Sequence, residues 1–238
     1  MTHLNNQVIS CPEKKAIAET VHETLCEFRD ELKGLEDSGY AGYTDNLEGS
    51  CFYYAALGVE VCKKFYQQRF NDTESDYTLK AGFFALRPYK DKTQQLAWLR
   101  YSGDIDNNIN DYHCWIVGPV SIKDGKEKFD IIDFTARHYK AQVEKKAKLS
   151  WEREDLEKRN FIWNDNHVLC DYHLGDGQES KALAFAEEGL VFGVKEDTTI
   201  KIKDEKWTDW KSCDLRVQMM EKSAEILSYK LANLENQA

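Results

Sequence analysis

The stretch that most constrains this sequence is residues 48–56, EGSCFYYAA, in which a glycine and a serine lead into a run with helical spacing. Glycine permits a tight turn and serine is favoured at a helix start, so we expect Cys51 at the N-terminus of a helix that runs to about Phe70. The unpaired N–H groups of a helix N-terminus favour a thiolate over a thiol. The sequence therefore predicts a reactive cysteine, and its chemistry needs a base and a group that orients the base.

Composition and charge limit the classes of partner. Hydrophobic residues make up 42% of the 238 residues and aromatic residues 12%, as in a globular protein. The formal net charge of −10 argues against a general nucleic-acid binder, because neutralising phosphates needs a basic face. No apolar run approaches the length of a membrane span, and the N-terminus lacks the form of a signal peptide. We expect a protein substrate as partner, with no nucleic acid and no membrane.

The cysteines indicate a reducing compartment. There are seven of them, an odd number, without the spacing of a disulfide framework. We interpret them as mostly reduced thiols and expect a protein that is cytoplasmic as synthesised, with export as an effector left open. The oligomeric state does not follow from the sequence.

Hydrophobic periodicity predicts helices at both ends of the chain. Apolar residues recur at steps of three and four over residues 13–36 and again over 214–235. No repeat or linker marks a boundary between them, so we predict a single domain over residues 1–238. Its core spans about 37–205, and the two helices are extensions of it.

Between these helices the sequence predicts strands. Residues 77–86, 95–101, 113–119 and 129–135 are rich in apolar and aromatic residues and bounded by turn-prone ones. The dipeptide at 124–125, Asp-Gly, is a strong hairpin signal. A turn centred there pairs residue 113 with about 135, so we expect His113 and Asp133 at the same end of an antiparallel hairpin.

The remaining segments are assigned from local pattern. We predict a charged surface helix over 139–160, a short helix over 179–188 and a strand over 198–202. The loop at 164–177 contains His167, Cys170 and His173 but no second Cys/His pair at a usual zinc spacing. The polar loop at 102–112 resembles the start of a calcium loop, although Ile109 replaces the turn glycine and Trp115 the closing acid. We therefore predict no metal and no cofactor.

Three residues on separate predicted elements form a possible catalytic triad. Cys51 at a helix start would be the nucleophile, and His113 at a strand start would take the thiol proton. Asp133, near the end of the next strand, would hold the imidazole in the productive tautomer and favour the imidazolium. Each residue alone has an ordinary structural explanation, and the agreement of all three contexts is what favours catalysis.

With these residues identified, the sequence resembles the papain-like cysteine enzyme superfamily. Gly49-Ser50-Cys51-Phe52 is similar to the papain-type turn before the nucleophile, and His113-x-Trp115 with Asp133-x-Thr135 is similar to the transglutaminase-like branch. The segment at 133–137, DFTAR, also resembles papain-fold domains of bacterial toxins and effectors. The resemblance, which covers about residues 43–139, implies an α+β fold in which a helix carrying the cysteine packs on an antiparallel sheet carrying histidine and aspartate. It also implies acyl-transfer chemistry.

The oxyanion donor departs from the family pattern. Asp45 and Asn46 stand where papain-type enzymes have a glutamine, and no tryptophan precedes Trp98. The backbone N–H of Cys51 is the first candidate, and the side-chain candidates for oxyanion or substrate contact are Asn46, Tyr43 and Trp115.

Two classes of function follow. The first is a thiol hydrolase or acyltransferase acting on a protein amide: a cysteine peptidase, a glutamine deamidase or, if an amine resolves the acyl-enzyme, a transglutaminase. The second is a catalytically inactive papain-like module that binds a partner. An unrelated α+β fold in which all three residues are structural is the third alternative.

Overall fold

The computed structural model describes residues 9–36, 47, 50–71, 75–90, 99–103, 111–123, 126–167, 169–173, 179–185 and 189–236. It has an α+β fold, in which helices pack on an antiparallel sheet and the N- and C-terminal helices contact each other. The α+β class predicted from the sequence is thereby confirmed.

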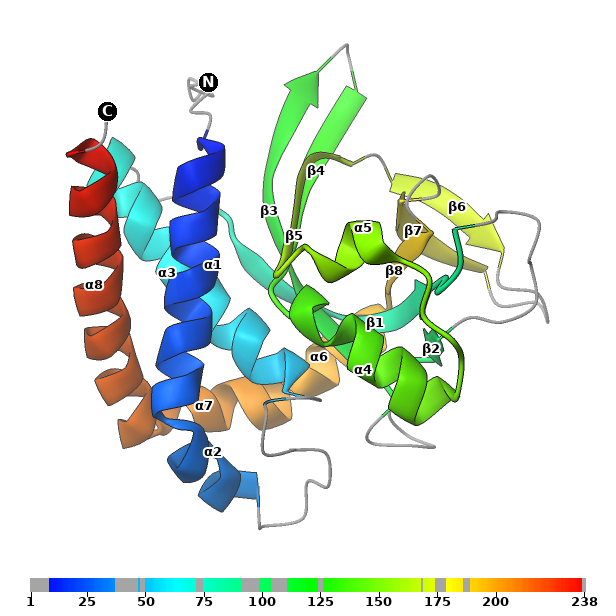
Figure 1. The fold of residues 1–238 in the computed structure, drawn as a ribbon, viewed down its shortest axis with the longest axis horizontal. Helices are drawn as coiled ribbons and strands as arrows, with labels where there is room; N and C mark the ends of the chain where they lie inside the picture. Colours follow the sequence, from blue (N-terminus) through cyan, green and yellow to red (C-terminus); the bar gives the residue numbers. More distant parts are fainter. Residues whose placement is uncertain are drawn as a thin grey trace.

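Three long helices lie side by side: α1 (Cys11–Glu27), α3 (Cys51–Phe70) and α8 (Asp214–Glu235) (Figure 1). α1 begins with a capping box, in which Ser10 and Glu13 satisfy each other's backbone N–H groups. The predicted helix over 13–36 is interrupted at Phe28, after which α2 (Arg29–Glu36) continues. The ammonium group of Lys230 on α8 bonds Glu19 and Glu23 on α1, at 3.3 and 2.9 Å.

The strands form one sheet in which every pairing is antiparallel. Within the described residues its order is β5-β4-β3-β1-β8-β7-β6, and β2 pairs with β1. The strands are β1 (Thr78–Leu86), β2 (Leu99–Tyr101), β3 (His113–Lys123), β4 (Lys126–Asp133), β5 (Ile162–His167), β6 (Leu169–His173), β7 (Glu179–Phe185) and β8 (Leu190–Val194).

Alternation along the strands divides the core into two clusters. Cys114 and Ile116 belong to the cluster shared with α1, α3 and α8, whereas Trp115 and Val117 belong to the cluster on the other side of β3. α3 packs closely on the sheet at Gly58, where a Cβ atom would lie 2.6 Å from the Phe134 ring and 2.7 Å from Ile116. A glycine is therefore required for this contact between the helix and the sheet.

The second cluster is closed by short helical turns that follow β4. These are η1 (Ala136–His138), α4 (Tyr139–Gln142), η2 (Val143–Ala147) and α5 (Glu154–Glu157), which lie together in Figure 1. The single surface helix predicted over 139–160 is wrong, because Lys148 adopts a left-handed conformation with φ 56° and ends the helical segment. Its apolar residues Tyr139, Val143 and Leu156 are buried.

Three further predictions of secondary structure are wrong. Residues 179–185 form β7 and not a helix, because β6 and β8 pair with them on both sides. The loop predicted at 164–177 includes strand residues of β5 and β6. The strand predicted at 198–202 lies in α6 (Glu196–Ile202), whose first turn carries two acidic residues that suit a helix N-terminus. η3 (Lys203–Trp207) and α7 (Thr208–Ser212) connect α6 to α8.

Among the helices that the structure describes, none combines the length and the apolar character needed to cross a membrane.

Candidate active site

Cys51 is the first residue of α3, as the sequence predicts. Ser50 is the N-cap, but its side chain makes no capping bond and donates instead to the carbonyl oxygen of Leu47, a residue in the left-handed region with φ 64°. The first backbone bond of the helix joins the Tyr54 N–H to the Ser50 carbonyl at 3.2 Å. The Ser50 hydroxyl therefore does not cap the N–H groups of the first turn.

His113 is the first residue of β3 and is 2% exposed. Its ring lies among aromatic rings of the second core cluster, with the Phe84 ring centre 4.4 Å away and the Tyr101 ring centre 6.0 Å away. This apolar surrounding fixes the imidazole and removes it from water. A charge on the ring therefore needs a partner inside the protein.

Asp133, the last residue of β4, supplies that partner. Its Oδ2 lies 2.6 Å from His113 Nε2, and the carboxylate is 1% exposed. In the β3–β4 ladder Ile116 pairs with Ile132. If the same register is extended to the first residue of β3, His113 lies opposite Thr135. The hairpin pairing predicted from the turn at 124–125 is thus confirmed up to the end of the ladder, although the turn residues themselves lie outside the described part of the chain.

The Asp133 carboxylate accepts further hydrogen bonds from two other residues. The Thr135 N–H and hydroxyl donate to Oδ1 at 2.8 and 2.6 Å, and the Tyr139 hydroxyl donates to Oδ2 at 2.6 Å. Burial alone would raise the pKa of Asp133, but the His113 charge and these donors hold the pKa below its usual value. The carboxylate is therefore ionised and held in one orientation.

The charge of Asp133 determines the protonation of His113. Burial by itself would lower the pKa of the imidazole, but the charge and hydrogen bond of Asp133 raise the pKa to about 10, with a smaller contribution from Cys51. His113 is an imidazolium at neutral pH. Because Nε2 bonds Asp133, Nδ1 is the ring nitrogen left for Cys51.

The Cys51 sulfur interacts with two adjacent residues of β3, Cys114 and His113. A hydrogen bond from the Cys114 thiol is the larger cause that lowers the pKa of Cys51, followed by the hydrogen bond and charge of His113. Together they outweigh burial, which opposes ionisation, and hold the pKa well below its usual value. Burial and the Cys51 charge raise the pKa of Cys114, which stays a thiol. The result is a thiolate–imidazolium pair at Cys51 and His113.

The structure thus brings Cys51, His113 and Asp133 together. It does not support a substrate contact by Trp115, and it does not describe Asn46 and Tyr43. Trp115 is 0% exposed in the second core cluster, so its ring has no surface to offer a substrate. Asn46 and Tyr43 lie outside the described residues. The Cys51 backbone N–H remains the oxyanion candidate among the described residues, since it belongs to the first turn of α3.

Sequence reasoning assigned no role to three residues of this site: Cys114, Thr135 and Tyr139. A signal existed for Thr135, because a hydroxyl two residues after an aspartate commonly bonds its carboxylate. Tyr139 carried no signal, because its segment looked like a surface helix. Cys114 follows His113 on a strand, where alternation would direct its side chain to the opposite face.

Among the described residues no group of three metal-binding side chains converges. His167 lies on β5, and Cys170 and His173 lie on β6. The side chains of these three residues lie outside the described part of the structure.

Comparison with known proteins gives little further information. No family model and no curated protein matches this chain. A crystal structure of a genomics target superposes with a TM-score of 0.45 and 14% sequence identity, over 95% of this chain and 82% of that chain.

Proposed function

We propose that the protein is a cysteine-dependent acyl-transfer enzyme that acts on a protein amide, as a peptidase or a glutamine deamidase. The observation that carries the proposal is the buried His113–Asp133 pair at 2.6 Å, with the Cys51 sulfur against the same imidazole at a helix N-terminus. Nucleophile, base and orienting group stand in the order that thiol catalysis needs.

In the proposed acylation the Cys51 thiolate attacks the carbonyl carbon of the amide. The C=O electron pair moves to the oxygen, to which the Cys51 N–H would donate a hydrogen bond. His113 then gives its proton to the departing nitrogen as the C–N bond breaks, leaving a thioester on Cys51 and a neutral imidazole. Asp133 stabilises the imidazolium before this transfer and holds the ring in position.

Deacylation reverses the role of His113. The neutral imidazole takes a proton from water, the resulting hydroxide attacks the thioester, and Cys51 leaves as the thiolate. An amine in place of water would give a transglutaminase-type product with the same residues. Mass spectrometry of candidate protein substrates separates a cleaved chain, the mass change of glutamine deamidation and an amine adduct.

We propose, together with this activity, that the fold is papain-like and that the protein is cytoplasmic as synthesised and acts as an effector. The α+β class, the helix that carries Cys51 and the strands that carry His113 and Asp133 agree with a papain-like fold.

Alkylation by iodoacetamide tests the thiolate–imidazolium pair directly. We expect Cys51 to be modified faster at pH 6 than the exposed thiols of Cys11 and Cys26, measured by peptide mass spectrometry. The substitution His113→Ala should abolish this preference. The Cys62→Ala substitution, at a buried thiol whose pKa burial raises, should retain it. Equal reactivity of Cys51 and the exposed thiols would contradict the proposal.

One observation favours a second candidate, a papain-like module that binds a partner without catalysis. The Cys51 residue is only 7% exposed, so a substrate has little direct access to the sulfur. Rapid alkylation of Cys51 by iodoacetamide, together with failure of a bulky maleimide to react with Cys51 in a separate, unalkylated sample, would favour this candidate. Turnover of any amide that is lost in Cys51→Ala would exclude it.

A further inference from the structure

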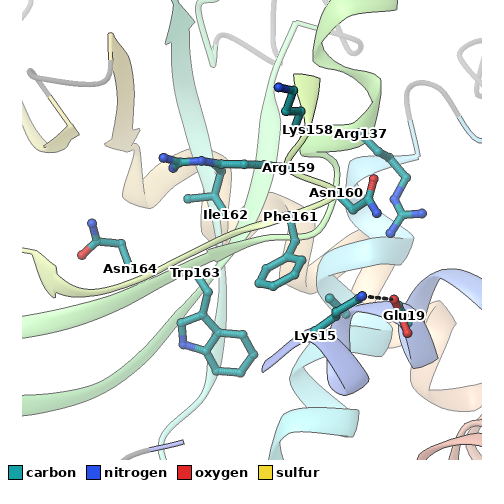
Figure 2. Close-up of a pocket in the computed structure, with 11 residues that line it drawn as sticks. Lys15, Glu19, Arg137, Lys158, Arg159, Asn160, Phe161, Ile162, Trp163 and Asn164 are labelled. Atoms are coloured by element: carbon teal, nitrogen blue, oxygen red, sulfur yellow. Dashed lines mark ion pairs between the residues drawn. The ribbon is translucent and has the colours of Figure 1, made fainter. Parts of the chain in front are cut away.

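A cavity of about 540 Å³ lies away from Cys51, between α1, η1 and the start of β5 (Figure 2). This volume falls within the roughly 300–1,000 Å³ of small-molecule sites. The lining residues come from three segments distant in sequence: Lys15, Ala18 and Glu19 from α1, Arg137 from η1, and residues 158–164.

The charge of the cavity is opposite to that of the chain. Four basic side chains line it, Lys15, Arg137, Lys158 and Arg159, against one acidic residue, Glu19. The chain as a whole carries a formal charge of −10. Lys15 Nζ lies 3.7 Å from Glu19 Oε1 across one turn of α1. This largely solvated ion pair contributes little to stability. The cavity is therefore a local basic site on an acidic protein, which attracts an anion.

Arg137 is the unusual member of this set. Its Nε and Nη2 atoms are buried and have no hydrogen-bond partner among the described residues. Burial lowers the pKa of the guanidinium, and the opposing effects of Tyr54 and Cys26, followed by those of Glu19 and Glu23, do not offset it. Neither glutamate forms an ion pair with Arg137 in the described structure. The Arg137 side chain as a whole is partly buried, and no carboxylate lies at ion-pair distance from it in the described structure. A guanidinium charge without such a partner beside a cavity points to an anionic occupant.

The rest of the wall is suited to a flat ring. Phe161 and Trp163 are partly buried and pack against the helix-side core cluster, and Figure 2 shows the Phe161 ring in the middle of the lining residues. The ammonium group of Lys14 lies 5.6 Å from the centre of the Trp163 ring. Asn160 adds a side-chain amide, whose donor and acceptor match the edge of a nucleobase.

We propose that this cavity binds a nucleoside monophosphate, with the phosphate on Arg137 and Lys15 and the base against Phe161, near the Asn160 amide. The phosphate supplies the negative charge that the Arg137 guanidinium lacks among its partners in the described structure. A single nucleotide fits the volume of the cavity, whereas a nucleic acid would need the extended basic face that this chain lacks. The inference is independent of the proposed acyl transfer.

Isothermal titration calorimetry of the full chain with adenosine monophosphate, adenosine and inorganic phosphate as probes tests the proposal. We expect saturable binding of the monophosphate and binding at least about tenfold weaker for adenosine and for phosphate. Arg137→Gln should weaken monophosphate binding by at least about tenfold, and Lys158→Glu, at the exposed rim, by several-fold. Lys63→Gln, which removes an exposed positive charge on α3 outside the cavity, should leave binding unchanged.

Several results would overturn the proposal. These are no binding of the monophosphate at millimolar concentration, equal binding by inorganic phosphate, and binding that survives both Arg137→Gln and Lys158→Glu. An equal loss in Lys63→Gln would show general attraction of anions and would also overturn it. The Lys158→Glu variant keeps the test valid if Arg137→Gln fails to fold, because Lys158 is exposed. Binding by Cys51→Ser should equal that of the wild type, which separates this inference from the acyl-transfer proposal.

Discussion

Asp133 and Arg137 stand four residues apart where β4 leads into η1, and their charged groups differ in burial and in partners. The Asp133 carboxylate is fully enclosed and receives hydrogen bonds from His113, Thr135 and Tyr139. Arg137 is partly buried, and two of its N–H groups are enclosed without any partner in the described structure. A buried charge with a complete set of partners is held in one orientation inside the protein. A charge with an incomplete set costs stability and lacks a neutralising partner, which an anion from outside can supply.

The strongest test of this difference is to remove the Asp133 charge with Asp133→Asn. The substitution leaves His113 with no carboxylate, so we expect a loss of about 3–5 kcal/mol of unfolding free energy, as for a broken buried ion pair. The pKa of His113 should fall, and with it the thiolate fraction of Cys51 at pH 6. Urea unfolding measures the first effect and the iodoacetamide rate measures the second, which we expect to fall at least about tenfold.

Asp155→Asn is the matched control for this substitution. Asp155 pairs with the buried Arg153 at 2.8 Å, but its own side chain is 45% exposed, so water screens the pair and its loss should cost less than the loss of Asp133. Equal costs for the two variants would show that the network around Asp133 adds nothing beyond a half-exposed ion pair.

The dependence of stability on pH tests the charge pair itself. The pKa of His113 rises from 6.5 to about 10 on folding, so its stabilisation is complete below pH 6.5 and is lost as the pH rises through about 10. The pKa of Cys51 falls from 9.0, so its stabilisation is complete above pH 9.0 and is lost as the pH falls through the lowered pKa. Between about pH 6.5 and 9 the folded and the unfolded state each hold one proton on these two groups. The contributions of His113 and Cys51 to the pH dependence of stability therefore cancel in this range.

Cys51→Ser should break this cancellation. Asp133 still raises the pKa of His113 in the variant, so the folded state holds an extra proton above pH 6.5. Stability relative to the wild type should then decline by up to about 1.4 kcal/mol per pH unit, until the pH reaches the pKa of His113 in the variant. Urea unfolding of both proteins at a series of pH values measures the difference. Parallel curves would contradict the thiolate–imidazolium pair.

Tyr139 tests how far the network depends on a single neutral donor. Tyr139→Phe removes the 2.6 Å bond to Asp133 and leaves the ring, so we expect a loss of about 2 kcal/mol of unfolding free energy. The pKa of Asp133 should rise and the acid limb of Cys51 alkylation should move to higher pH. Tyr101→Phe is the control, since Tyr101 is buried in the same cluster and donates no hydrogen bond to Asp133 within the described structure.

The contrast between Tyr139 and Asp133 also shows what the sequence can predict. His113 and Asp133 were predicted together, because strand alternation and a two-residue turn signal determine which residues face each other across a hairpin. α3 and its starting residue were predicted from the Gly-Ser pair and the periodic run that follows it. These signals are local, and packing reinforces them.

What the sequence did not predict depends on contacts between distant segments. Tyr139 reaches Asp133 because residues 136–147 turn back over the sheet, which a charged, helix-prone segment does not indicate. β7 has a helix-forming sequence and is a strand because of its two neighbours. The basic cavity unites α1, η1 and β5, so none of its side chains had a recognisable motif.

The smallest expected effect, and the one of opposite sign, belongs to Arg137. Arg137→Met keeps an unbranched chain that is shorter than arginine and removes the two unpaired donors, so we expect the unfolding free energy without ligand to stay unchanged or rise by up to about 1 kcal/mol. Thermal unfolding of the ligand-free protein measures this. Adenosine monophosphate should raise the melting temperature of the wild type but not of the variant. A large loss of stability in Arg137→Met without ligand would mean that Arg137, like Asp133, serves the fold itself.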